Sequence, residues 1–202
     1  GGMRAMFLAG IILILAWSLG LVTEVLGTAS YISGLLEGNL PAQLLPALVF
    51  VTAAAIAFAT GTSWGTMGIL LPIVIPLAVA LGGTVDPAAG TAYVILLGSI
   101  ASVLAGAIFG DHCSPISDTT VMSSMASACD HVDHVRTQLP YALAVGLVGV
   151  VLGNIPTAYG FPVWLSLLLS AGFLFALLRF YGKKDFDSPQ WAEERANGPA
   201  ED

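Results

Sequence analysis

Long uncharged and mainly apolar stretches alternate with short polar connections along this chain. Four stretches contain no Asp, Glu, Lys or Arg, and they cover residues 5–23, 38–85, 87–110 and 137–178. About 20 apolar residues cross the hydrocarbon core of a membrane as a helix, so there is room for about six complete or partial crossings. No alternation of period two runs through them, which argues against a membrane β-barrel. The pattern predicts an all-α polytopic membrane protein.

Interruptions in the apolar pattern divide these stretches into separate helices. The run over residues 44–82 is interrupted at residues 61–66, and the run over residues 91–109 ends in a second interruption at residues 110–118. The acidic segment 182–202 is expected to be a disordered cytoplasmic tail, so the predicted transmembrane domain covers residues 1–181. Helices are expected over residues 6–26, 44–82 with its break, 91–109, 119–129 as a half-helix, 138–153 and 162–181.

Composition agrees with a chain that lies mostly in lipid. Hydrophobic residues make up 56% of the sequence and charged residues 9%, and the mean hydropathy is +0.88. Soluble domains have roughly a quarter of their residues charged, so the lipid bilayer is expected to cover most of the surface. The net charge is −7, and six of the thirteen acidic residues lie in the tail. No basic patch exists, so nucleic acid is not an expected partner.

The positions of the basic residues predict an orientation. All six Lys and Arg residues can be placed on one side of the membrane, and the positive-inside rule makes that side cytoplasmic. The expected protein is therefore a multi-pass protein of the cell (inner) membrane with a cytoplasmic C-terminus. Residues 44–82 must then cross an even number of times, either as a re-entrant hairpin turning at residues 61–66 or as two complete spans. Residues 91–129 cross once, as a broken transmembrane helix.

Both interruptions combine helix-breaking residues with oxygen-bearing side chains. Gly61 and Gly65 bracket the first, and Gly110 and Pro115 lie in the second; glycine disfavours a continued helix, and proline removes a donor and clashes with the preceding turn. Irregular backbone at membrane depth is tolerated where it is buried in protein or lines a watery cavity. Carbonyls and helix ends exposed there can coordinate sodium or a substrate anion. Close helix packing alone is the simpler alternative.

Two acids in the second interruption favour ion binding over packing, because carboxylates at membrane depth are costly without a use. An apolar setting disfavours the charged form of an acid, so such a group can hold a proton or a sodium ion in turn. Asp118 is expected to have the main role and Asp111 to assist it, unless Asp111 lies near the membrane edge. No cofactor and no metal beyond transported sodium are expected. The predicted ion-binding residues are Thr62, Ser63, Thr66, Asp111, Ser114, Ser117, Asp118, Thr119 and Thr120.

The histidines are weaker candidates. His112 adjoins Asp111 and is a candidate proton relay or pH sensor. His131, Asp133 and His134 have a spacing that suggests a metal pair, but they lie in the expected cytoplasmic connection before residue 138. An ordinary polar connection is the favoured interpretation there.

The residues around both interruptions resemble the NhaC-type sodium/proton antiporter family. Residues 106–120 read GAIFGDHCSPISDTT, residues 137–141 read TQLPY, and residues 61–66 read GTSWGT before a proline-containing apolar stretch. The resemblance covers residues 5–181. It implies secondary transport driven by a sodium or proton gradient, and one repeat of an inverted-repeat transporter with re-entrant hairpins and broken helices. The chain resembles the carboxy-terminal half of such proteins, so a missing amino-terminal repeat or a second copy is an expected partner.

The function predicted from the sequence is exchange of sodium ions for protons across the cell membrane, without enzymatic activity. The nearest alternative is a sodium- or proton-coupled transporter or exchanger of small carboxylates or amino acids. An intramembrane metal-dependent hydrolase using Asp111, His112, Asp118 and the later histidines is a further alternative, although no His-Glu-x-x-His motif is present. The last alternative is a partner subunit that does not itself transport.

Overall fold

The computed structural model describes residues 41–182, together with isolated positions between Ile14 and Gly34. The helix expected over residues 6–26 lies outside the described residues except at a few isolated positions, and the tail from residue 183 onward lies wholly outside them. The described part contains helices and no strand, so the all-α prediction is confirmed there. The elements are η1 (Ala42–Leu44), α3 (Leu45–Thr60), α4 (Ser63–Ala80), η2 (Pro87–Ala89), α5 (Thr91–Cys113), α6 (Asp118–Ala126), α7 (His131–Val148), the π-helical η3 (Gly149–Asn154), α8 (Ile155–Ala158) and α9 (Val163–Tyr181).

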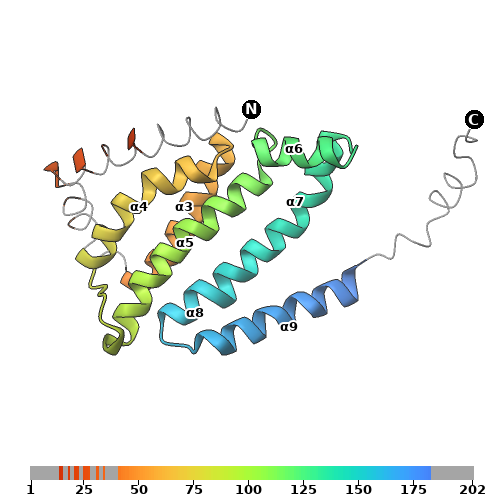
Figure 1. Ribbon diagram of the computed structural model, residues 1–202. Helices are drawn as coiled ribbons and strands as arrows, with labels where there is room; N and C mark the ends of the chain where they lie inside the picture. Colours follow the sequence, from red (N-terminus) through yellow and green to blue (C-terminus); the bar gives the residue numbers. More distant parts are fainter. Residues whose placement is uncertain are drawn as a thin grey trace, which may run out of the picture. The chain divides into compact units, whose positions relative to one another are not determined.

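Five helical segments in this part of the chain are long and apolar enough to cross a membrane (Figure 1). The segment formed by η1 and α3 meets that criterion, and α4 meets it separately, which fits the two-span alternative for residues 44–82. Large apolar side chains stay exposed along α7 and α9, as expected of surfaces that face lipid or further protein. The spans cover Ala42–Thr60, Ser63–Ala80, Thr91–Cys113, His131–Ala158 and Val163–Phe180.

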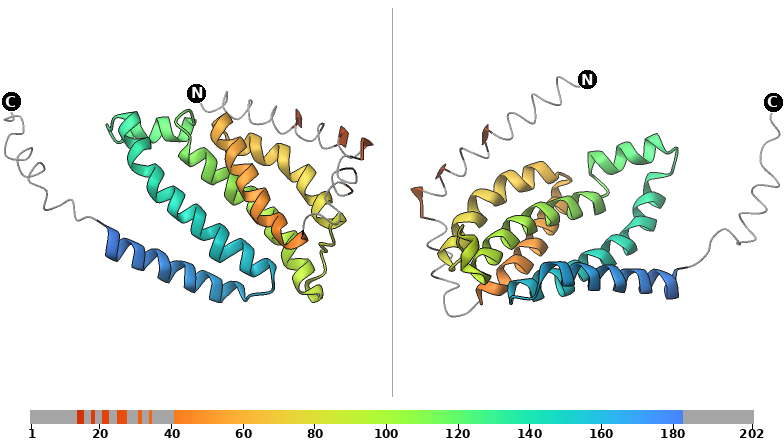
Figure 2. Two further views of the ribbon diagram at one scale, coloured as in Figure 1. Left: turned by 180° about the vertical axis from the view of Figure 1, so that it is seen from behind. Right: turned by 60° about the horizontal axis from the view of Figure 1, so that its bottom comes forward.

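Residues 1–170 form one compact unit, and residues 171–202 form a second, of which the described part is the remainder of α9. Within the first unit α5 is the central helix, in contact with α3, α4, α6, α7 and α8 (Figures 1 and 2). Its apolar core is contributed by α3, α4 and α5, with Val49, Val74 and Val103 among the buried side chains.

Small residues bring the backbones of α3 and α5 into direct contact. A Cβ atom on Gly106 would overlap the carbonyl oxygen of Phe50, and one on Gly110 would overlap the carbonyl oxygen of Ala54. Membrane helices associate closely through such small residues spaced four apart, because van der Waals packing replaces the hydrophobic effect in lipid. This contact fixes the last turns of α5 against the middle of α3.

The second interruption is shorter than predicted. Residues 110–113 continue α5 and only residues 114–117 are irregular, so the half-helix is Asp118–Ala126 and not residues 119–129. Gly110 stays helical because the absence of a side chain there allows α5 to pack directly against the backbone of α3. The first interruption also narrows, to Gly61 and Thr62, because the Thr62 side chain accepts a hydrogen bond from the Gly65 backbone and caps α4.

The prediction of a polar connection before residue 138 is wrong, because these residues are helical: α7 begins at His131. The Asp130 carboxylate accepts hydrogen bonds from the backbone N–H groups of Val132 and Asp133 at 2.9 and 3.1 Å, which caps the helix. The helix also outlasts its predicted end at residue 153. It continues through η3, where the Asn154 amide donates to the Ser102 hydroxyl at 3.1 Å, to the end of α8.

The helix contact predicts that Gly110→Ala destabilises the protein, by about 1–3 kcal/mol, because a new methyl group must displace the α3 backbone. Thermal unfolding of the complete protein in detergent measures this. Gly149→Ala is the matched control, since Gly149 has helical backbone angles (φ −59°) and no neighbour within 4 Å of an added Cβ. Equal unfolding temperatures for the two variants would contradict the tight contact.

Candidate ion-binding site

The two helix breaks lie against each other. Gly61 ends α3 in the left-handed conformation, with φ 67°, and its N–H donates to the Ala57 carbonyl at 2.8 Å. A Cβ atom at this position would lie 2.9 Å from the carbonyl oxygen of Ile116 in the second break. Both the backbone angle and the lack of space therefore require glycine.

Ser114 links the second break to α3. Its side chain is fully buried, and its hydroxyl donates to the Phe58 carbonyl at 2.8 Å. The same oxygen accepts from the Ile116 N–H at 3.3 Å. The carbonyls in the last turn of a helix have no hydrogen-bond donor within that helix. Ser114 provides a donor for one of them, and the same hydrogen bond positions the second break.

Asp111 is the buried acid of the site. It lies in the last turn of α5 and is 8% exposed. Oδ2 accepts a hydrogen bond from the Ser63 hydroxyl at 3.2 Å, across from the first turn of α4. Oδ1 is buried and has no hydrogen-bond partner among the described residues. Leaving a buried carboxylate oxygen without a partner is costly.

The surrounding helix ends add partial charges. The C-terminal ends of α3 and α5 carry partial negative charge, and the N-terminal ends of α4 and α6 carry partial positive charge. Asp111 lies at the negative end of α5, where a carboxylate is disfavoured and a cation is favoured. Ser63 lies at the positive end of α4 and gives the one hydrogen bond that offsets this cost.

The predicted hydroxyl residues of the first break serve mainly to shape it. The Thr62 hydroxyl accepts from the Gly65 N–H at 3.3 Å, and the Thr66 hydroxyl, which is buried, donates to the Thr62 carbonyl at 2.9 Å. The Thr62 side chain is half-buried, as is that of Ser63. Of these residues, Ser63 is the one whose side chain reaches Asp111.

Residues of the second break and α6 divide into buried and exposed groups. Ser117 is fully buried, with its hydroxyl 2.8 Å from that of the exposed Thr119. Thr120 is buried, and its hydroxyl donates to the His112 carbonyl at 3.4 Å. The side chains of Asp118 and His112 are exposed in this chain. Ion binding by these residues stays a prediction, and burial gives Asp111 the stronger structural case of the two acids.

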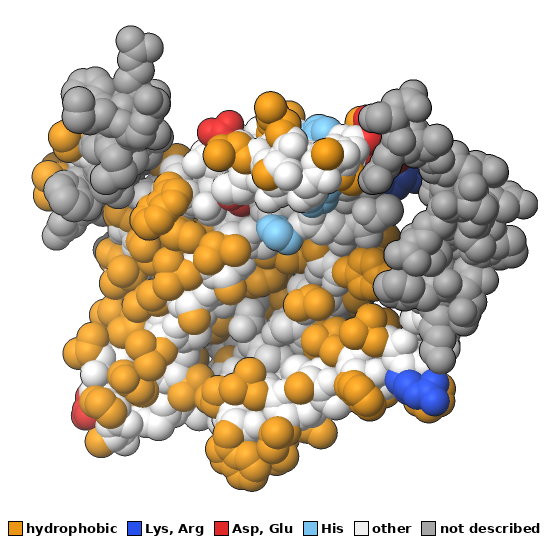
Figure 3. All heavy atoms as spheres, turned by 45° about the vertical axis from the view of Figure 1, so that its right-hand side comes forward, with side chains coloured by type: hydrophobic (Ala, Val, Ile, Leu, Met, Phe, Trp, Pro, Cys, Tyr) orange, Lys and Arg blue, Asp and Glu red, His pale blue; other side chains and the backbone are white. Residues whose placement is uncertain are grey.

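A histidine pair at the start of α7 also reaches the second break, which the sequence reasoning did not anticipate. The His131 ring donates from Nε2 to the Pro115 carbonyl at 2.7 Å, and Nδ1 of both His131 and His134 lies 3.1 Å from the Ser124 hydroxyl. The sequence feature that could have indicated this contact is Asp130, a helix-capping residue that places both histidines in the first turn of one helix. In Figure 3 histidine and acidic side chains gather toward the top of a mainly hydrophobic face.

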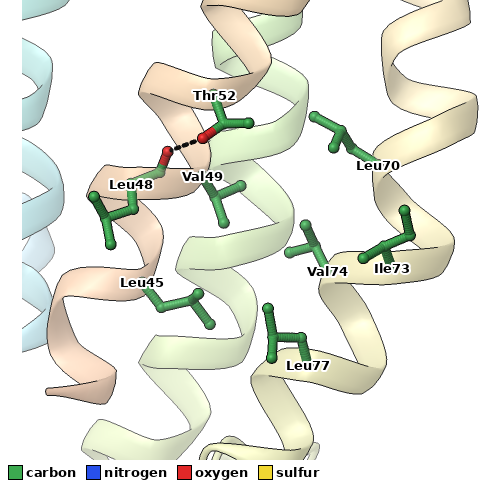
Figure 4. A pocket seen from close by; sticks show the side chains of 8 residues that line it. All are labelled: Leu45, Leu48, Val49, Thr52, Leu70, Ile73, Val74 and Leu77. Atoms are coloured by element: carbon green, nitrogen blue, oxygen red, sulfur yellow. Dashed lines mark hydrogen bonds between the residues drawn. The ribbon is translucent and has the colours of Figure 1, made fainter. Parts of the chain in front are cut away.

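The polar site is distinct from an apolar cavity of about 220 Å³ between α3 and α4 (Figure 4). The hydroxyl of its polar lining residue, Thr52, donates to the Leu48 carbonyl of the same helix at 2.9 Å, so the lining does not suit a cation. In the part of the chain that the structure describes, no group of three or more His, Cys, Asp or Glu residues could hold a metal ion. The cavity is lined by Leu45, Leu48, Val49, Thr52, Leu70, Ile73, Val74 and Leu77.

Comparison with known proteins places this chain in a family. The model of the Na⁺/H⁺ antiporter family matches residues 1–154, which include both breaks, α6 and α7. An uncharacterized protein of Haemophilus influenzae is 47% identical over 144 residues, covering 71% of this chain and 26% of that protein. No solved structure matches.

Two further relatives have antiporter names. An uncharacterized Na⁺/H⁺ antiporter of Haemophilus influenzae is 32% identical over 148 residues, covering 66% of this chain and 29% of the relative. The malate-2H⁺/Na⁺-lactate antiporter of Bacillus subtilis is 34% identical over 109 residues, covering 54% of this chain and 20% of the relative. The chain thus spans less than a third of the length of each.

The Ser114 link gives a testable prediction for the site. Ser114→Ala leaves the Phe58 carbonyl without its buried donor and frees the second break, and we expect a loss of about 1–3 kcal/mol of stability. Thermal unfolding of the complete protein measures it. Thr52→Ala is the control, because the Thr52 hydroxyl is exposed and bonds only within its own helix; an equal loss there would show that Ser114 has no special role.

Proposed function

Because this chain belongs to the Na⁺/H⁺ antiporter family, we propose that it is part of a secondary transporter that exchanges sodium ions for protons across the cell membrane. A family of transporters points away from an enzyme. The observation that carries the proposal is the buried Asp111 carboxylate, one oxygen of which has no partner in the described part of the chain.

Asp111 is the group that alternates between the two cargoes. Sodium is a hard cation that prefers oxygen ligands, and a carboxylate with a neighbouring hydroxyl provides them. In the charged state of the acid, Oδ1 and the Ser63 hydroxyl oxygen are ligands for sodium. In the neutral state a proton occupies the carboxyl group and the ion is released. The cargoes compete because each neutralises the same buried charge.

The other predicted residues surround this acid. Asp118 adds a second negative charge at the start of α6 and attracts the cation toward the break. His112 is the candidate relay for protons at the exposed side. No cofactor takes part, and sodium and protons are cargo. The residues that complete the proposed site, through hydroxyl or backbone oxygens, are Thr62, Thr66, Ser114, Ser117, Thr119 and Thr120.

We propose further that α3 and α4 form a re-entrant hairpin and that this chain is one repeat of an inverted-repeat transporter with a cytoplasmic C-terminus. The contact between the first break and the second supports it, since irregular backbone is tolerated at membrane depth where protein buries it. The share of the relatives that this chain spans leaves room for another repeat, which would cover the exposed faces.

A second candidate function is exchange of small carboxylates coupled to sodium or protons. The name of the Bacillus subtilis relative favours it. The N-terminal ends of α4 and α6 at the breaks are suited to an anionic group, because their free N–H groups and dipoles attract negative charge. Uptake of radiolabelled malate or lactate into vesicles separates this function from simple sodium/proton exchange.

Asp111→Asn is expected to abolish exchange, because an amide can neither release a proton nor neutralise a bound cation. The measurement is sodium-dependent proton movement in vesicles that contain the complete protein. Asp86→Asn is the matched control: Asp86 is exposed in the connection between α4 and α5, where it caps only η2. Undiminished exchange in Asp111→Asn would contradict the assignment of Asp111 as the ion- and proton-binding acid. Loss of exchange in Asp118→Asn but not in Asp111→Asn would assign that role to Asp118.

The hairpin predicts limited access to the first break from both sides of the membrane. In a variant without Cys113 and Cys129, a cysteine replacing the exposed Trp64 should react slowly with a membrane-impermeant maleimide in both right-side-out and inside-out vesicles. Val85→Cys, in the exposed connection before α5, is the control and should react quickly from outside only. Rapid labelling of the Trp64 position in inside-out vesicles alone would favour two complete spans.

A further inference from the structure

Asp111 lies between two residues whose backbone is held by neighbouring helices. On one side, Gly110 packs against the α3 backbone at Ala54. On the other side, the carbonyl of His112 accepts a hydrogen bond from the side-chain amide of Gln138, on α7, at 3.1 Å. His112 is in the last turn of α5, where the helix provides no backbone donor for this oxygen. A carbonyl oxygen only accepts hydrogen bonds, so the amide nitrogen of Gln138 must face it.

The His112 carbonyl joins the ends of three helices. It also accepts a hydrogen bond from the Thr120 hydroxyl of α6, at 3.4 Å, and the bond from Gln138 is the shorter of the two. A carbonyl oxygen has two lone pairs, so these two donors use its full capacity. This oxygen therefore serves as an anchor for α5, α6 and α7 beside the acid, and it could become a sodium ligand only by losing a donor.

Gln138 belongs to a stripe of α7 that faces α5. Further along the helix, Gly146 is buried, and a Cβ atom there would lie 2.7 Å from the Phe109 ring. Beyond it, the Asn154 amide donates to the Ser102 hydroxyl at 3.1 Å. The contact between the two helices thus has an amide hydrogen bond at each end, and only the one from Gln138 reaches a residue next to the acid.

We propose that Gln138 is a positioning residue of the ion site, whose amide ties the end of α5 to α7 and so sets the position of the Asp111 carboxylate relative to Ser63. The proposal rests on the function assigned to Asp111. Sodium needs several oxygens at fixed distances, so its binding depends on how firmly the carboxylate is held. Gln138 acts through the backbone, because its hydrogen bond is to the His112 carbonyl, whereas the carboxylate is bonded by Ser63.

The exposure of this hydrogen bond separates positioning from overall stability. Gln138 is half-buried and the bond is exposed in this chain, so water can donate to the His112 carbonyl when the amide is removed. The carbonyl keeps a partner, and what is lost is the link between α5 and α7. One hydrogen bond typically changes an equilibrium constant about two- to tenfold. We expect an effect of that size on the affinity for sodium.

Gln138→Met tests the proposal, because methionine has a similar length and no side-chain N–H group. In vesicles that contain the complete protein, the KM for sodium should rise about two- to tenfold. The maximal rate should stay within about twofold, since saturating sodium fills the site in both proteins. Gln138→Asn keeps an amide but withdraws it from the carbonyl by one methylene group, so it should raise the KM as well. It takes the place of Gln138→Met if that variant does not fold.

Asn154→Leu is the matched control. It removes an amide hydrogen bond of the same length from the other end of the same contact, roughly 24 Å along the helix from Gln138. It should lower the unfolding temperature and keep the wild-type KM. A wild-type KM in a folded Gln138 variant overturns the proposal, and so does an equal rise of the KM in Asn154→Leu. Either result leaves the role of Asp111 intact, because Asp111→Asn tests that role separately.

Discussion

A buried carboxylate with one unpartnered oxygen is the constraint on which the site depends. Asp111 has a single hydrogen bond, from Ser63, and its other oxygen meets no donor in the part of the chain described. In a soluble protein such a group would be a defect that costs stability. In the function proposed for this chain, the unmet interaction is available to a cation or a proton, and to only one of them at a time.

The fold keeps that oxygen in place through backbone contacts more than through side-chain packing. Gly110 brings the last turn of α5 against α3, so that Asp111, the next residue, faces the first turn of α4. Gly61 allows the chain to leave α3 beside the second break, and Ser114 links that break back to α3. Gly61 and Gly110 lack a side chain because a Cβ atom would occupy the space in which two backbones meet.

The membrane character, the apolar helices from α3 onward and the position of both breaks could be predicted from sequence, since apolar length and helix-breaking residues are local properties. The details could not. Gly110 suggested a break but continues a helix, because its contact with α3 outweighs its low helix propensity. His131 looked like part of a connection until its cap at Asp130 was visible. Whether Asp111 or Asp118 is buried depends on tertiary contacts that no spacing encodes.

The central claim is that one carboxylate takes sodium and a proton in turn. It is tested most directly by counting the protons that sodium displaces from the purified complete protein in weakly buffered detergent solution, followed with a pH indicator. The account predicts that sodium binding releases protons at a pH at which the carboxyl group is protonated, and that the release disappears when the pH is high enough to ionise that group beforehand. Sodium binding with unchanged affinity and no proton release at any pH would contradict it.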